Sequence, residues 1–85
     1  MKPIPGQVYT WSTVSDEYKS ICYALITSCI YDIVWYDLVG FNDDNTIDQI
    51  IRNCDGYGDG FIECEPKATL VTDPKIIALI KVALL

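Results

Sequence analysis

Apolar and polar positions alternate over short distances at the start of the chain, as they do in strands. Val8, Tyr9, Thr10 and Trp11 follow this alternation, which predicts a strand at residues 7–11. Residues 12–19 (STVSDEYK) are polar and rich in turn-forming types, which predicts a loop. The N-terminal part of the chain is therefore expected to contribute to a sheet.

The densest apolar segment, residues 20–41 (SICYALITSCIYDIVWYDLVGF), has two interpretations. Apolar positions from 18 to 34 fit the spacing of one helix, with Ser15 as its N-cap. The content of isoleucine, valine, tyrosine, tryptophan and threonine instead favours strands. We favour two antiparallel strands at residues 24–30 and 33–39, separated at Tyr31 and Asp32, and the single helix stays open as the alternative.

The second half of the chain alternates turns with short elements. Residues 41–45 form a loop, and Thr46 is placed to cap a short helix at residues 47–54 with isoleucines on one face. The stretch CDGYGDGFIEC at residues 54–64 predicts a glycine-rich turn that leads into a strand at residues 61–65, which Pro66 ends. Residues 68–72 add one more strand or an extended return.

A terminal helix is the clearest single element. Asp73 is a favourable N-cap and Pro74 suits the first helical position, so a helix is predicted over residues 73–85. Its apolar side chains point to most sides, and such a helix must pack on something. The expected partner is the chain's own sheet, and the alternative is a homodimer interface through Ile76, Ile80 and Leu84.

These elements define a fold class. They predict a single α+β domain over residues 1–85, with a small antiparallel sheet or SH3-like partly open barrel and a C-terminal helix. A chain of 85 residues buries roughly 60–65% of its unfolded surface, so one core is expected. With 51% apolar residues, some apolar surface is expected to cover a partner or a second copy.

The charge balance is acidic, with a formal net charge of −6. Such a surface repels phosphate backbones and anionic membranes, so direct binding of nucleic acid or membrane is not expected. An acidic surface fits a protein partner with a basic groove, including a protein that normally holds nucleic acid. Solubility is the alternative explanation of the charge.

The four cysteines, Cys22, Cys29, Cys54 and Cys64, are expected to be reduced thiols. The N-terminus has no apolar core of a signal peptide, and the longest apolar run is interrupted by aspartates, so neither secretion nor a membrane span is expected. A cytoplasmic location follows, which is the host cytoplasm if the protein is encoded by a phage. The cysteine spacing and the absence of histidine do not fit a zinc site.

Catalysis is not expected from this sequence. Without histidine the chain lacks the commonest general base and the Ser-His and Cys-His nucleophile pairs. The glycines at 56, 58 and 60 read G-x-G-x-G, which is neither a Walker A loop nor a dinucleotide fingerprint. The expected protein is a non-enzymatic one without a cofactor.

Calcium binding is the alternative for the glycine-rich turn, because residues 55–63 resemble a degenerate EF-hand loop. Asp55, Asp59 and Glu63 would be the carboxylate ligands. Tyr57 and Pro66 stand where further ligands are needed, so any such site would hold calcium only at millimolar concentrations.

Aromatic and acidic residues together predict a protein-contact surface. Tyrosine and tryptophan anchor protein interfaces, and this chain has six tyrosines and two tryptophans. Strand propensity alone also explains them. The predicted contact residues are Trp35, Tyr36, Asp37, Asp43, Asp44, Asp55, Tyr57 and Asp59.

The opening PGQVYTW, the polar loop after it and the two apolar runs with a carboxylate between them resemble the start of small SH3-like barrels. Short acidic proteins of tailed phages have this general look. The resemblance covers residues 5–40 and implies a small binding barrel without catalysis, often an accessory protein or a host-directed inhibitor of anti-defence type, such as an anti-CRISPR protein. It assigns no functional residues.

These observations lead to one functional hypothesis, a phage-type inhibitor that binds a host or defence protein through an acidic, aromatic surface. The alternatives are a weak calcium-binding domain and a homodimeric structural protein.

Overall fold

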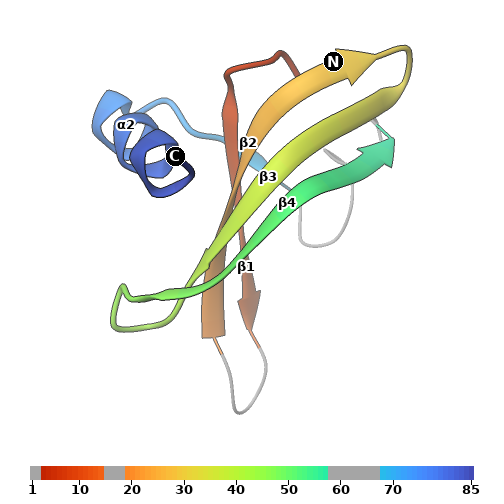
Figure 1. Cartoon of the computed structure of the whole chain (residues 1–85). Coiled ribbons are helices and arrows are strands. Elements are labelled where there is room, and N and C mark those ends of the chain that lie inside the picture. Colours follow the sequence, from red (N-terminus) through yellow and green to blue (C-terminus); the bar gives the residue numbers. More distant parts are fainter. Residues whose placement is uncertain (1–2, 15–18, 58–67) are drawn as a thin grey trace.

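The chain forms one antiparallel sheet of five strands and a C-terminal helix (Figure 1). The computed structural model describes residues 3–14, 19–57 and 68–85. In chain order the elements are β1 (Val8–Val14), β2 (Lys19–Ile30), β3 (Ile33–Phe41), β4 (Ile47–Tyr57), β5 (Thr69–Leu70) and α2 (Pro74–Ala83). The strand order is β4-β3-β2-β1-β5, and over the described residues the sheet is not closed. The predicted α+β class is confirmed.

The dense apolar segment folds as two strands, and the alternative of a single helix is wrong. Ile30 pairs with Ile33, so Tyr31 and Asp32 form the two-residue connection between β2 and β3. Both strands are longer than predicted, because pairing continues beyond the predicted ends as far as Ile21 opposite Phe41. On its other side β2 pairs with β1 as far as Lys19 opposite Val14, so the predicted loop at residues 12–19 is shorter.

The predicted helix at residues 47–54 is wrong, because these residues belong to β4. Its isoleucines pair with β3, Ile50 opposite Val39 and Ile51 opposite Leu38. The three-residue spacing of Ile47 and Ile50 is typical of a helix. In the structure, a register shift between Gly40 and Phe41 accommodates this spacing within a strand. The extra residue on β4 brings positions three apart to the same face of the sheet, as a β-bulge does.

Each face of the sheet has its own apolar core. On the α2 side, the core consists of Val8, Val39, Val71, Ile80 and Leu84. On the other face, Tyr9, Ile26 and Val34 form a second cluster. The helix covers one face of a strongly twisted sheet, as Figure 1 shows.

The predicted start of the terminal helix is confirmed. Asp73 is the N-cap, its carboxylate accepts a hydrogen bond from the Lys75 backbone N–H at 2.9 Å, and Pro74 follows in the first turn. Ile80 is fully buried and Leu84 nearly so, and Ile76 packs against the same core. The helix therefore docks on its own sheet, which uses Ile80 and Leu84 within the chain, while Ile76 stays partly exposed. A homodimer contact through this helix stays a prediction.

The return toward the N-terminal strand is short. β5 pairs with β1 through Leu70 opposite Tyr9 and Thr69 opposite Thr10, and the Val71 N–H donates to the Val8 carbonyl at 2.8 Å. Residues 68–72 are thus a brief strand with an extended continuation. The strand predicted at residues 61–65 lies outside the described residues.

Candidate protein-contact surface

The predicted contact residues separate into different parts of the sheet. Trp35 on β3 lies opposite Asp55 on β4, so these two side chains share one face near the β2–β3 turn. Tyr36 points to the opposite face, where it packs against the second core. Asp43 and Asp44 follow β3 at its other end. One continuous surface containing all of them is therefore not formed.

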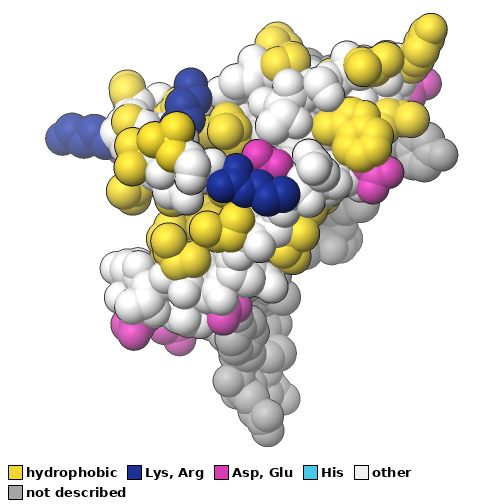
Figure 2. Space-filling view, viewed as in Figure 1, with side chains coloured by type: hydrophobic (Ala, Val, Ile, Leu, Met, Phe, Trp, Pro, Cys, Tyr) yellow, Lys and Arg dark blue, Asp and Glu magenta, His cyan; other side chains and the backbone are white. Residues whose placement is uncertain are grey.

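A smaller aromatic and acidic patch does form at the β2–β3 turn. We call it the hairpin-end patch, and it consists of Ile30, Tyr31, Asp32, Ile33, Trp35 and Asp55. Ile30 and Ile33 are register partners, and Ile33 and Trp35 share a face by strand alternation. Ile30 is 57% exposed and Tyr31 is 90% exposed. Figure 2 shows hydrophobic and acidic side chains together at the upper right end of the strands.

Tyr31 has an unusual backbone for a bulky residue. Its φ is +56°, in the left-handed region that glycine and asparagine adopt more readily. Two-residue hairpin connections require a positive φ, which explains the geometry but not the residue type. A large aromatic ring is consequently presented at the tip of the hairpin.

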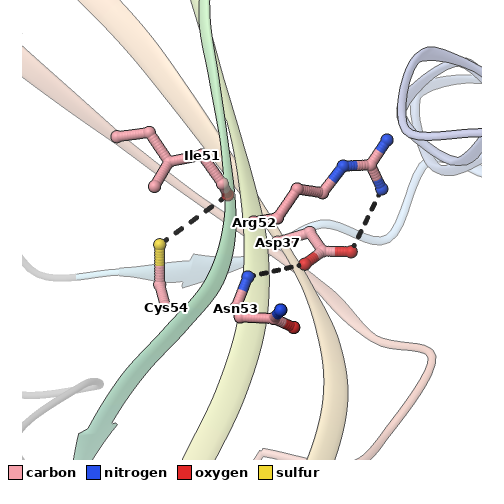
Figure 3. Close-up of polar contacts among 5 residues, drawn as sticks. All are labelled: Asp37, Ile51, Arg52, Asn53 and Cys54. Atoms are coloured by element: carbon pink, nitrogen blue, oxygen red, sulfur yellow. Dashed lines mark hydrogen bonds and ion pairs between the residues drawn. The ribbon is translucent and has the colours of Figure 1, made fainter.

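The side chain of Asp37, on β3, is mostly buried. Its carboxylate accepts a hydrogen bond from the Asn53 backbone N–H at 3.1 Å and forms an ion pair with Arg52 at 3.4 Å (Figure 3). Asn53 has a positive φ and lies where the β3–β4 register shifts. This predicted contact residue therefore stabilises the irregular part of β4.

Asp43 and Asp44 lie in the tight connection between β3 and β4. The Asp44 carboxylate accepts hydrogen bonds from the Thr46 backbone N–H at 3.1 Å and from the Thr46 hydroxyl at 2.5 Å. The side-chain hydrogen bond, followed by the backbone one, lowers the pKa of Asp44 below its usual value. The turn thus presents a fixed negative charge.

The sequence predicted Asp55 and Tyr57 at the tip of the glycine-rich turn. In the structure they belong to the end of β4. Tyr57 pairs with Ile33 and Asp55 with Trp35. Beside them, burial raises the pKa of the Cys54 thiol, and the negative charges of Asp37 and Asp55 add to the effect. Cys54 is therefore a protonated, weakly nucleophilic thiol at neutral pH.

Three of the four cysteines lie in the described residues. Cys22, Cys29 and Cys54 are free cysteines there, and Cys22 is buried. Their reduced state stays a prediction. Cys64 and the predicted contact residue Asp59 lie outside the described residues.

Within the described ranges, no cluster of three or more Cys, Asp and Glu side chains could hold a metal ion. Two of the three proposed calcium ligands, Asp59 and Glu63, fall outside those ranges. In the same part of the chain, no helix has the length and hydropathy needed to cross a membrane.

The surface charge is distributed unevenly along the chain. From residue 19 to residue 57, β2, β3, β4 and their turns carry six aspartates against Lys19 and Arg52. Arg52 is already paired with Asp37. The hairpin-end patch thus belongs to an acidic half of the sheet.

Sequence reasoning left four residues out of the contact set, namely Ile30, Tyr31, Asp32 and Ile33. Tyr31 and Asp32 had been identified only as a break between strands. A two-residue break between apolar runs is the signature of a hairpin tip, where side chains are exposed. That signal was sufficient to include them.

No protein-family model, curated protein or solved structure matches this chain.

Proposed function

We propose that this chain is a non-enzymatic protein-binding module whose contact surface is the hairpin-end patch. The observation that carries the proposal is Tyr31, a nearly fully exposed tyrosine held at positive φ between two exposed isoleucines. Exposed aromatic anchors within apolar surroundings are typical of binding hot spots. A rigid two-residue turn also reduces the entropy that binding would cost.

The partner in this proposal is a protein with a basic surface. Asp32 and Asp55 lie at the patch, and the surrounding strands are acidic. Complementary charge steers association and favours partners of opposite sign. In its most specific form, which comes from the resemblance of residues 5–40, the chain is a phage-type inhibitor. It would occupy a basic, nucleic-acid-binding surface on a host or defence protein.

The test is an affinity capture from bacterial lysate at low salt with three baits. These are the natural chain, Tyr31→Gly, and Leu85→Gly as a control at another highly exposed apolar position. We expect a protein enriched by the natural and control baits and depleted at least tenfold with Tyr31→Gly. Its capture should weaken as salt rises, because exposed charges are screened.

Quantitative mass spectrometry of the eluates decides the outcome. An eluate equal to that of a bait-free column would contradict the proposal. Equal capture by Tyr31→Gly and the natural chain would show that binding uses another surface.

We also propose that the open sheet is a partly open, SH3-like barrel. Support comes from β5, which returns beside β1, so that the first strand has a neighbour on each side. The strong twist of the long strands, visible in Figure 1, bends the sheet in the way that barrels require. An experimental structure in which the two edge strands diverge would contradict it.

A further inference from the structure

A second apolar surface lies on the same face of the sheet as Trp35, at the other end of β3. Two cross-strand rows define it. Ile21, Phe41 and Ile47 form one row, and Tyr23, Val39 and Ile50 form the next. Ile47 and Ile50 are 48% and 42% exposed. The register therefore gathers large apolar side chains that the helix does not fully cover.

The β2 and β3 members of these rows, Ile21, Tyr23 and Phe41, border a groove of about 290 Å³ together with the helix. The residues that line it include Ile21, Tyr23 and Phe41 from the sheet, Ile76 and Leu79 from α2, and Asn45 from the β3–β4 turn. Tyr23 and Phe41 form its floor in an edge-to-face contact, with ring centroids 5.7 Å apart. Leu79 is 59% exposed, so the helix side of the groove is open to solvent.

The β3–β4 turn, which contributes Asn45 to the groove, is acidic and is held by hydrogen bonds. Asn45 belongs to the turn that also carries Asp43 and Asp44. Besides the Thr46 bonds to Asp44, the Asn42 amide donates to the Thr46 hydroxyl at 3.1 Å, and the Asn42 N–H donates to the Thr46 carbonyl at 2.9 Å. Asp48 follows on β4. The helix carries two lysines, Lys81 and Lys75, and Lys75 is next to the lining residue Ile76.

We propose that this groove binds a short basic segment of another protein that inserts one or two large apolar side chains. The apolar lining selects the inserted side chains. The three aspartates in and next to the turn, Asp43, Asp44 and Asp48, outnumber the two lysines of the helix and select lysine and arginine beside them. For scale, an apolar cavity of roughly 150 Å³ holds a benzene ring, so the volume suits a leucine or phenylalanine side chain with part of its neighbour.

This inference is independent of the hairpin-end patch. The two surfaces lie at opposite ends of β3, with the Asp37–Arg52 pair between them in register. Figure 2 shows hydrophobic side chains around the helix and again at the far upper right, with a basic and an acidic side chain between the two areas.

The probe for the test is a fluorescein-labelled 14-residue peptide of leucine and lysine in amphipathic order. A peptide in which glutamate replaces every lysine controls for nonspecific apolar binding. We expect the lysine peptide to bind at least tenfold more tightly than the glutamate peptide in fluorescence anisotropy. When the lysine peptide is added to the nitrogen-15-labelled protein, the changes in the protein's amide chemical shifts should cluster at Ile21, Tyr23, Phe41 and Asn45.

Two substitutions on α2 form a matched pair. Leu79→Ser removes a side chain that lines the groove, while Val82→Ser changes a side chain of similar exposure, 65%, that does not line it. We expect about a tenfold loss of affinity for Leu79→Ser, as burial of one leucine implies, and less than a twofold loss for Val82→Ser. Asp43→Asn should weaken binding about twofold, and Asp32→Asn at the hairpin-end patch should not.

Equal affinities for the two serine variants, or equal binding of the two peptides, would overturn the inference. So would shift changes confined to Tyr31 and its neighbours, which would place binding at the other surface. Sedimentation of the natural chain without peptide tests whether a second copy of the chain occupies the groove. A dimer that Leu79→Ser dissociates would assign the groove to a second copy.

Discussion

Tyr31, Asn45 and Asn53 all have positive φ, but the conformational free energy that this backbone geometry requires differs between tyrosine and asparagine. Asparagine enters the left-handed region readily, and its two positions are a tight turn and a register shift. Tyrosine does so at a cost of about 1 kcal/mol or more. Strain at an exposed aromatic position indicates that the side chain serves a purpose other than stability.

Replacing Tyr31 with glycine therefore tests this separation of stability and binding. Glycine accepts a positive φ without strain, which offsets its larger loss of chain entropy. We expect the unfolding free energy of Tyr31→Gly to be unchanged or raised by up to about 1 kcal/mol in urea titrations. A loss of more than about 1 kcal/mol would mean that the Tyr31 side chain stabilises the fold.

Local signals at single residues were reliable where the residue type itself imposes a geometry. Asp73 and Pro74 predicted the helix start, and Tyr31 and Asp32 predicted the end of β2. Solvent exposure was harder to predict, since Trp35 and Tyr36 are adjacent in the sequence but point to opposite faces. Only the register assigns Trp35 to Asp55 and Tyr36 to Cys54.

The hairpin of β3 and β4 shows how a pattern misleads at the level of one element. Isoleucines at 47, 50 and 51 have helical spacing, yet they lie in a strand whose register shift between Gln49 and Ile47 places Ile47 and Ile50 on one face. Bulges depend on backbone geometry and leave only a weak trace in the sequence. The strand propensity of isoleucine was the better guide, as it was for β2 and β3.

The turn between these strands should give the fold a specific dependence on pH. The pKa of Asp44 is lower in the folded chain, mainly through its side-chain hydrogen bond with Thr46, so the ionised form favours folding. That contribution is present above the unfolded pKa, near 4, and is lost as pH falls through the folded pKa.

We expect Asp44→Asn to destabilise the chain at about pH 7 and to have a progressively smaller effect as pH falls below about 4 and through the folded pKa, because the natural carboxyl then becomes protonated too. Urea titrations across that range measure the difference. Asp43→Asn removes the same charge from the same turn without the Thr46 hydrogen bonds and serves as the control. A difference that stayed constant with pH would contradict the assignment.

At the scale of the whole molecule, the helix completes the core on one face. Ile80 has no exposed surface and packs with Val8, Val39 and Leu84, while its neighbour Leu79 is largely exposed. The sequence predicted that the helix must pack on something, with its own sheet as the favoured partner and a dimer interface as the alternative. It could not predict which side chains face inward, because apolar residues lie on most sides of the helix.

We expect Ile80→Ala to lower the unfolding free energy by about 2–5 kcal/mol and Leu79→Ala by less than about 1 kcal/mol. Urea unfolding followed by circular dichroism measures both. Because the contacts of Ile80 lie within one chain, the loss should not depend on protein concentration. A loss that grew on dilution would instead place Ile80 in contact with a second copy.

The residues of the predicted contact surface come together only in part. Aromatic and acidic residues do meet at Trp35 and Asp55, but Asp37 is tied to Arg52 and Asn53, and the Asp43–Asp44 turn lies at the far end of β3. Composition reports how many such residues exist. Their grouping depends on strand register and bulges, which pairwise patterns in one sequence do not specify.

The register shifts in β4 have a further consequence for the colloidal behaviour of the chain. β4 ends the strand order on one side and carries three exposed isoleucines, a combination that promotes edge-to-edge polymerisation. Its ladder is irregular near Asn53 and again near Asp48, which divides the uninterrupted register with β3 into two short stretches, residues 49–51 and residues 54–57. A strand with two register shifts is a poor template for fibril growth. The bulges that gave β4 the sequence pattern of a helix therefore also help to keep the chain dispersed.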